Sequence, residues 1–371
     1  MNLNGELLSG DRVIGVVENG LLVSYDEQRL PLYLLRTKDL EGWLTSRAID
    51  AHRTNSRLLK RALRIGSTDD MTAVLRVHAA TVTDTYWFRS EGESRSYDDI
   101  RFKENLFAAL ALRGDPDSFN QPYSPTPELT NIGSYEKCWR LSAGRWWMVK
   151  RGNELERFSE LLIFRIGRAL GFPMAEYVQE DDTVVSPNFT DGASVNFEAA
   201  VGLVGDSEDY AENFEIFWNI SSEIAREYLQ ILYMDALCFN MDRHTNNYGI
   251  LRDVDSGEIV SMAPNFDNNI ALFSRGIPEK LMRSNDKLIS LYLELLEKEK
   301  RALDFAEKFP VPTWEMVREC AIQSGVDMSE STVTAACDFI MVGSDIIQEE
   351  IQRLTMVYGD PDEEQDPKLI M

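Results

Sequence analysis

The chain has 371 residues, 44% of them hydrophobic and 27% charged, which is ordinary for a globular protein with two or three structural units and a large core. Its formal net charge of −24 disfavours direct binding to nucleic acids and to anionic membrane surfaces, because both depend on Lys and Arg. The four cysteines are scattered without a CxxC pair and there are three histidines, so a zinc site has little support and reduced thiols in a cytoplasm are indicated. No signal-peptide pattern and no apolar run of the ~18 residues needed to span a bilayer is present, so we expect a cytoplasmic protein.

Residues 1–115 are predicted to form an amino-terminal accessory region. Two β-rich runs around Asn19-Gly20 predict a hairpin, and Asp84–Phe88 is an aromatic strand candidate. Helical periodicity appears around Leu40–Leu44 and from Ser56 to Leu63. The only dense group of basic residues also lies here: Arg47, Arg53, Arg57, Lys60, Arg61 and Arg64. This group predicts either a solvated helix face or a grip on an acidic partner or on the acidic tail of the chain.

A linker is predicted at residues 116–127, where Pro, Ser and Asp are frequent. The main domain is expected over residues 128–358, with a small β-rich lobe up to about residue 190 and a helical lobe after it. Residues 359–371 are acidic and poor in apolar side chains, which predicts a disordered tail.

A strand–turn–strand pattern follows the linker, turns at Ser142–Gly144 and ends in Lys150. This is the form of a nucleotide-binding lobe, in which a strand lysine pairs with the α- and β-phosphates. The alternative is an exposed lysine at a strand end. The apolar spacing then predicts a helix from about Glu154 to Leu170, with Gly171 as its C-cap. Glu160 in this helix either forms the ion pair that fixes Lys150 or is an ordinary solvated glutamate.

The next predicted strand, Val184–Phe189, would act as a hinge that receives the adenine on its backbone, which makes Phe189 a candidate nucleotide contact. Several helices are then expected to complete the helical lobe, at Ser222–Cys238, Lys287–Lys308, Thr313–Ser324 and Ser331–Tyr358.

The most informative motif joins two acids and an amide. Asn247 follows Asp242 by five residues, and Asp267 follows Asn247 by twenty. Phosphoryl transfer from ATP needs one carboxylate to orient the attacking hydroxyl, and an amide and a second carboxylate to hold Mg²⁺. Between them, Tyr248–Asp253 and Ile259–Met262 predict a β-hairpin. A surface loop rich in turn-forming Asn and Asp is the alternative.

Taken together, these motifs resemble the HipA-like kinases, a bacterial branch of the protein kinases. The resemblance covers residues from roughly 128 to 275 and continues more loosely to about 355. The matching motifs are Gly133-Ser134-Tyr135-Glu136-Lys137, the Lys150 strand, the Glu160 helix, Asn240-x-Asp242-Arg243-His244-x-x-Asn247 and Ala263-Pro264-x-Phe266-Asp267. The resemblance implies that Asp242 is the catalytic base, that Asn247 and Asp267 are the metal ligands, and that Lys150 contacts the phosphates.

The phosphate loop implied by the resemblance is built from Gly133, Ser134 and Lys137. In the family's toxin a serine ahead of the glycine is autophosphorylated, and Thr130 holds that position here. Thr130 and Ser134 are therefore candidates for autophosphorylation, and capping or turning the loop is the alternative. The first hundred or so residues differ from the usual start of the toxin, so its substrate and its DNA-binding antitoxin do not transfer, and an antitoxin-like partner stays an open question.

We therefore predict an α+β, bilobal, protein-kinase-like fold with an accessory region. The expected activity is ATP- and Mg²⁺-dependent phosphorylation of Ser or Thr in a protein, including the chain itself. A basic or neutral protein substrate would be favoured electrostatically. Two alternatives are a small-molecule phosphotransferase and a nucleotide-binding scaffold without catalysis. A third is a metal-dependent hydrolase built on Asp242, His244 and Asp267.

Overall fold

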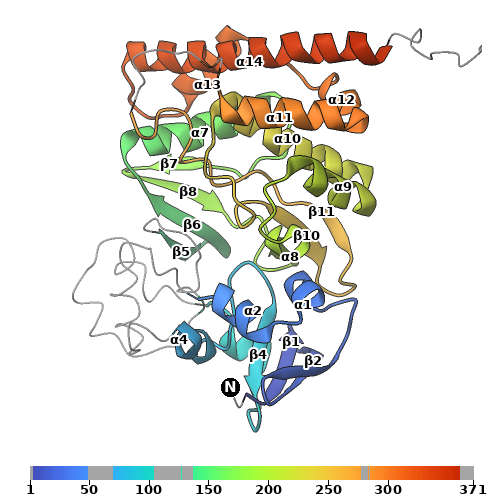
Figure 1. Cartoon of the computed structure of the whole chain (residues 1–371). Helices are drawn as coiled ribbons and strands as arrows, with labels where there is room; N and C mark the ends of the chain where they lie inside the picture. The colour runs from blue at the N-terminus through green and yellow to red at the C-terminus, as the bar shows by residue number, and fades with distance from the viewer. Residues whose placement is uncertain are drawn as a thin grey trace, which may run out of the picture.

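The computed structural model describes residues 3–48, 70–103, 127, 137–276, 283 and 285–359. Its strands form three antiparallel sheets, in the orders β3-β2-β1-β4, β5-β6-β8-β7 and β11-β10-β9. Figure 1 shows the first sheet at the amino-terminal end of the molecule, the second in the middle, and a layer of helices at the opposite end. The predicted α+β architecture, with a small β-rich lobe and a larger helical lobe, is confirmed.

The amino-terminal region has a sheet covered by short helices. Its elements are β1 (Gly5–Ser9), β2 (Arg12–Glu18), β3 (Leu21–Tyr25), α1 (Leu32–Thr37), α2 (Leu40–Ser46), α4 (Asp70–Arg76), β4 (Tyr86–Ser90) and α5 (Tyr97–Ile100). The predicted hairpin is present, and both turn residues, Asn19 and Gly20, have the positive φ of a type I′ turn. The strand candidate Asp84–Phe88 begins only at Tyr86, because the Asp84 side chain accepts a hydrogen bond from the Tyr86 N–H and turns the chain.

The prediction for the basic group is wrong at Arg47, its only described member. Arg47 follows α2 directly, and its side chain turns into the interior, where it is 7% exposed. There it pairs with Asp84 at 2.7 Å instead of facing solvent or an acidic partner. The other five basic residues lie outside the described part of the chain.

The small lobe packs one sheet against one helix. Its elements are β5 (Lys137–Ser142), β6 (Arg145–Arg151), α7 (Glu154–Ala169), β7 (Val178–Glu180) and β8 (Thr183–Pro187). The turn between β5 and β6 is at Ala143-Gly144, both with positive φ. Helix α7 ends as predicted, since Gly171 has φ +75° and the Phe172 N–H bonds to the Gly167 carbonyl in a Schellman arrangement. The predicted hinge strand is shorter than expected, and Asn188 and Phe189 follow it.

The helical lobe is built around one buried helix. Its elements are β9 (Val195–Ala199), α8 (Val201–Val204), α9 (Tyr210–Ile220), α10 (Ser222–Cys238), β10 (Gly249–Asp253), β11 (Ile259–Met262), α11 (Lys287–Lys298), α12 (Lys300–Ala306), α13 (Trp314–Gln323) and α14 (Glu330–Gly359). Every residue of α10 from Tyr228 to Cys238 is buried, as expected of a stretch that is apolar on most of its faces. The segment predicted at Lys287–Lys308 forms two helices, because Glu299 takes an extended backbone and its carboxylate pairs with Arg301.

A buried polar network joins the amino-terminal region to the helical lobe. Arg252 on β10 pairs with Glu198 on β9 at 2.6 Å, and Glu198 also accepts a hydrogen bond from the Tyr86 hydroxyl at 2.8 Å. Arg252 further donates to the backbone carbonyls of Gln28 and Leu30. The accessory region is therefore packed directly on the lobe that carries Asp242 and Asp267.

Several predictions lie outside the described residues. They concern the helix Ser56–Leu63, the linker except Pro127, the loop residues Thr130, Gly133 and Ser134, and the tail after Gly359. Gly359 itself is the last residue of α14. The four cysteines are buried. Within the described ranges, no helix has the length and apolar character that crossing a membrane requires.

Candidate active site

Three predicted residues meet at the junction of the lobes. The Nζ of Lys150, on β6, lies 3.2 Å from Glu160 Oε1, on α7, and 2.8 Å from Asp267 Oδ1, in the loop after β11. Glu160 is 2% exposed, so it is not a solvated helix glutamate, and Lys150 is not an exposed strand-end lysine. The ion pair expected between Lys150 and Glu160 is present.

Mutual attraction keeps Lys150 and Asp267 ionised despite their burial. Burial alone would lower the pKa of Lys150, but the carboxylates of Asp267 and Glu160 outweigh it and raise the pKa. Burial would likewise raise the pKa of Asp267, but the charges of Lys150 and Lys137 hold it well below its usual range. Asp267 is therefore an anion, which is the state a hard cation or a lysine requires of it.

Asp267 has an uncommon backbone conformation, and two hydrogen bonds fix the backbone at this position. Its φ of +62° is uncommon for a residue with a side chain, and such strain concentrates at functional sites. The Asp267 N–H donates to the Tyr177 hydroxyl at 3.1 Å. The N–H of the next residue, Asn268, donates to Glu160 at 3.3 Å. The sequence reasoning assigned no role to Tyr177, which no local motif marks.

The loop from Asn240 to Asn247 follows α10 and is held by its own amides. The side chain of Asn240 accepts a hydrogen bond from the Asp242 N–H at 3.1 Å. The side chain of Asn247 donates to the Asp242 carbonyl at 2.8 Å and lies 3.5 Å from its carboxylate. Asp242 is half-buried, and burial raises its pKa. The structure thus brings Asp242 and Asn247 together.

Arg243 ties this loop to the Asp267 loop. Its guanidinium contacts both carboxylate oxygens of Asp235, on α10, at 2.9 and 3.0 Å. It also donates to the carbonyls of Asn247 and Phe266 at 2.6 and 2.8 Å. Sequence reasoning missed this pair, although a lone acid in the apolar end of α10 was a signal, because a buried charge needs a partner.

A cavity of about 230 Å³ lies against this group. Strands β5 and β6 alternate, so that Lys137, Trp139, Met148 and Lys150 face it. Another side is aromatic, formed by Phe189, Phe197 and Phe266, whose ring centroids are 5.5 Å apart in each pair. Phe189 therefore lies in the cavity with Lys137, Lys150, Asn247 and Asp267, as a common nucleotide site would require.

The donor set suits Mg²⁺ better than a transition metal. Within the described ranges, no group of three or more His, Cys, Asp and Glu could hold a metal ion. Mg²⁺ requires fewer protein ligands, because one or two carboxylates are completed by phosphates and water. The anionic Asp267 and the amide of Asn247 fit that pattern.

The fold of this chain is similar to that of solved structures. The structure is similar to HipA of Shewanella oneidensis MR-1, solved as a toxin–antitoxin complex with HipB and operator DNA, with a TM-score of 0.58 and 14% sequence identity. That similarity covers 98% of this chain and 100% of HipA, so it includes the amino-terminal region. The proinflammatory kinase CtkA of Helicobacter pylori is similar over 60% of this chain and 95% of its own, with a TM-score of 0.46 and 18% identity. No protein-family profile matches the chain, and no curated protein matches it in sequence. The chain has the fold of a HipA-like kinase.

Proposed function

We propose that this protein is a kinase that transfers the γ-phosphoryl group of ATP to a Ser or Thr hydroxyl of a protein. The observation that carries the proposal is the position of Lys150 between Glu160 and Asp267, in one cavity with Asn247. Lys150 would contact the phosphates, and Glu160 would position Lys150. Asn247 and Asp267 would hold Mg²⁺, which when bound would neutralise charge on the phosphates.

Asp242 would orient the acceptor hydroxyl and take its proton. The loop that carries it also borders a second cavity, of about 1010 Å³, on the side of the loop next to α9 and α11. This cavity is lined in part by Tyr210, Met241, His244 and Leu288. Its size supports a protein segment as the acceptor more than a small metabolite.

The direct test is to incubate the purified protein with γ-labelled ATP, Mg²⁺ and a bacterial protein extract. Label on Ser or Thr of a protein, lost when Mg²⁺ is chelated, is the expected result. Label on a small molecule and on no protein would instead identify a small-molecule phosphotransferase. ATP binding without any transfer would identify a nucleotide-binding scaffold.

Lys150→Ala is expected to reduce phosphoryl transfer at least tenfold, which corresponds to about 1.4 kcal/mol or more. The variant removes the cation that faces the phosphates and leaves Glu160 and Asp267 without their shared partner. Steady-state kinetics would measure the loss. Arg140→Ala is the matched control, because Arg140 is on the neighbouring strand β5 and pairs with exposed Glu180. If the Lys150→Ala variant had the same kinetics as the parent, Lys137 or Arg151 would be the residue that contacts the phosphates.

Self-modification is expected at Thr130 or Ser134. A phosphate at either position would add about −1.5 to −2 charges to the phosphate loop that the family resemblance implies, so repulsion of the phosphates of ATP should switch the enzyme off. Mass spectrometry after incubation with Mg·ATP would locate it. Absence of phosphate from both residues in active protein would contradict self-inhibition, leave the kinase proposal intact, and favour a capping role for the two hydroxyls.

A further inference from the structure

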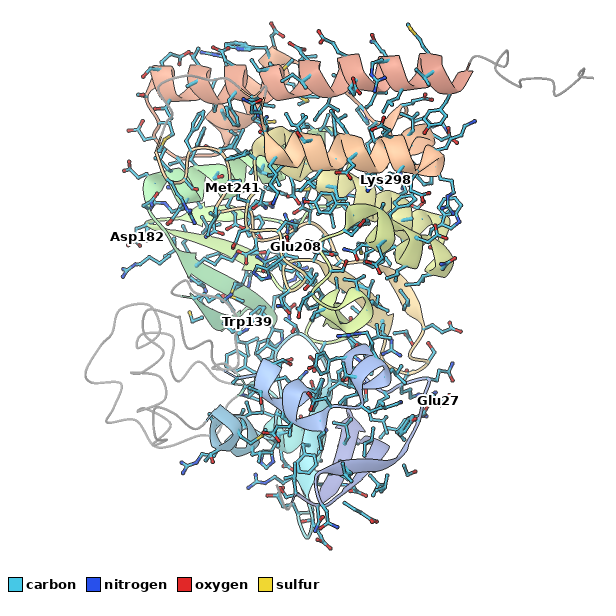
Figure 2. All side chains as sticks on the ribbon, in the orientation of Figure 1. Glu27, Trp139, Asp182, Glu208, Met241 and Lys298 are labelled. Atoms are coloured by element: carbon cyan, nitrogen blue, oxygen red, sulfur yellow. The ribbon has the colours of Figure 1, made fainter. Side chains whose placement is uncertain are left out.

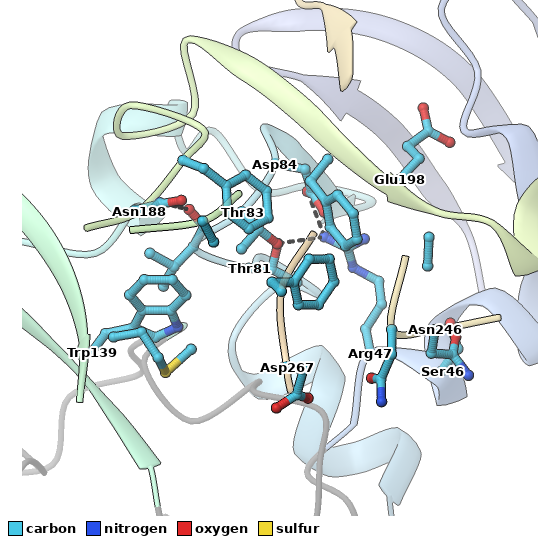
Figure 3. A pocket seen from close by; sticks show the side chains of 18 of the residues that line it. Ser46, Arg47, Thr81, Thr83, Asp84, Trp139, Asn188, Glu198, Asn246 and Asp267 are labelled. Carbon is cyan, nitrogen blue, oxygen red and sulfur yellow. Dashed lines mark hydrogen bonds and ion pairs between the residues drawn. The ribbon is translucent and has the colours of Figure 1, made fainter. Parts of the chain in front are cut away.

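The amino-terminal region supplies part of the wall of the proposed nucleotide cavity. Figure 3 shows Arg47, Thr81, Thr83 and Asp84 around the cavity, together with Asp267 from the loop after β11. The segment Thr81–Asp84 precedes β4 and is far in the sequence from the motifs of the main domain. The cavity is therefore bounded by three parts of the chain and not by the two lobes alone.

Both lobes hold this segment at the cavity. The Val82 carbonyl accepts a hydrogen bond of 3.0 Å from the side chain of Asn188, which follows the predicted hinge strand. The Thr83 carbonyl accepts one of 2.9 Å from the N–H of Phe197 on β9. The Val82 side chain also packs on Trp139, which lies at the border between the small lobe and the amino-terminal region (Figure 2). The position of the segment is thus fixed relative to the hinge.

Arg47 supports the same segment through hydrogen bonds. It donates to the Ala79 carbonyl at 2.6 Å, to Asp84 Oδ1 at 2.7 Å and to the Tyr86 carbonyl at 3.2 Å. Its charge is balanced by Asp84, so it does not present a free cation to a phosphate. Arg47 is a positioning residue for the segment.

Two hydroxyls of the segment remain available to a ligand. Thr83 is only partly buried and lines the cavity, and its hydroxyl makes no hydrogen bond to any other residue that the structure describes. The Thr81 hydroxyl accepts a long hydrogen bond of 3.3 Å from Arg47 and keeps its own proton to donate. Neutral hydroxyls beside the hinge suit the neutral nucleoside end of a nucleotide, whereas its phosphates require the cationic end at Lys150.

We infer that Thr81 and Thr83 contact the base or ribose of the bound nucleotide, so that the amino-terminal region is part of the nucleotide site. This inference rests on the proposed function. It predicts that changes in the segment weaken binding of ATP but not of inorganic triphosphate, which carries the phosphates without the nucleoside.

The test is calorimetric titration of the full chain with Mg·ATP and with Mg·triphosphate. Thr83→Val and Thr81→Val should each weaken ATP binding about two- to tenfold, the effect of one lost hydrogen bond, and leave triphosphate binding unchanged. Thr83→Trp should weaken ATP binding more than either, because its ring takes up space in a cavity of about 230 Å³. Thr183→Val is the matched control, since Thr183 is on β8 and its hydroxyl bonds to the Glu180 carbonyl away from the cavity.

The possible outcomes distinguish a failure of this inference from a failure of the proposed kinase function on which it rests. ATP affinities equal to the parent's in all three variants would overturn the inference and leave the kinase proposal standing. Equal losses for ATP and triphosphate would also overturn it, because they would indicate a general disturbance of the fold. A parent protein that binds triphosphate and ATP equally well would refute a nucleoside contact. If the parent protein bound neither ATP nor triphosphate, the proposed function itself would be refuted.

Discussion

Asp242→Asn and Asp267→Asn are each expected to abolish phosphoryl transfer. Loss of a general base typically costs about 10²- to 10⁴-fold in rate, and Asp242→Asn keeps the size of the side chain while removing its basicity. Nucleotide binding should survive in this variant, because Asp242 does not line the cavity that holds Lys150. Asp267→Asn should also weaken Mg²⁺-dependent binding, since it removes the carboxylate that is kept anionic beside Lys150.

The measurement is the rate of label transfer from γ-labelled ATP, together with nucleotide affinity at several Mg²⁺ concentrations. Asp182→Asn is the matched control, because this aspartate lies on the surface of the small lobe and pairs with partly exposed Arg151. It should transfer phosphate at the parent rate. Parent rates in both active-site variants would show that the catalytic assignment is wrong.

The elements that the sequence predicted well are those whose cause is local. The turns at Asn19-Gly20 and Ala143-Gly144 were each predicted from a short stretch of sequence that contains a glycine, and both residues of each turn have positive φ. Helix α7 carries its own capping box, formed by Asn153 and Glu156, and its own glycine stop. The spacing of Asp242 and Asn247 reports a local hydrogen bond, from the Asn247 side chain back to the Asp242 carbonyl. In these cases the residues that interact are also close in the sequence.

The features that the sequence could not predict depend on partners far apart in the chain. Arg47 is a member of a basic group by composition, but Asp84, 37 residues later, draws it into the interior. Glu198 and Arg252 face each other only because β9 and β10 pair. Both side chains also form hydrogen bonds with the hydroxyl of Tyr86, in the amino-terminal region. Periodicity identifies which face of an element is apolar but does not identify which distant charge neutralises a buried one. The part of the cavity wall formed by the segment Thr81–Asp84 likewise depends on residues far apart in the chain.

Arg243→Met is expected to be the most destabilising single change in the helical lobe, at about 3–5 kcal/mol, the cost of leaving one partner of a buried ion pair alone. Asp235 is 1% exposed, and burial already raises the pKa of its carboxyl against the opposing charge of Arg243. Without Arg243 that folded-state pKa should rise further above the unfolded value. The stability deficit relative to the parent should therefore be largest near neutral pH and shrink as the pH falls and Asp235 is protonated.

Urea unfolding of three variants would separate the charge effect from the lost contacts. The double variant Arg243→Met/Asp235→Leu removes both charges, so it should recover part of the stability lost in the single variant. It should not recover activity, because the carbonyls of Asn247 and Phe266 still lack the donor that joins their two loops. Arg226→Met is the control for a surface pair, since Arg226 and its partner Glu223 are 38% and 60% exposed, and it should cost about 1 kcal/mol or less. If Arg243→Met were no more destabilising than Arg226→Met, the guanidinium would not be what holds the Asp242 and Asp267 loops together.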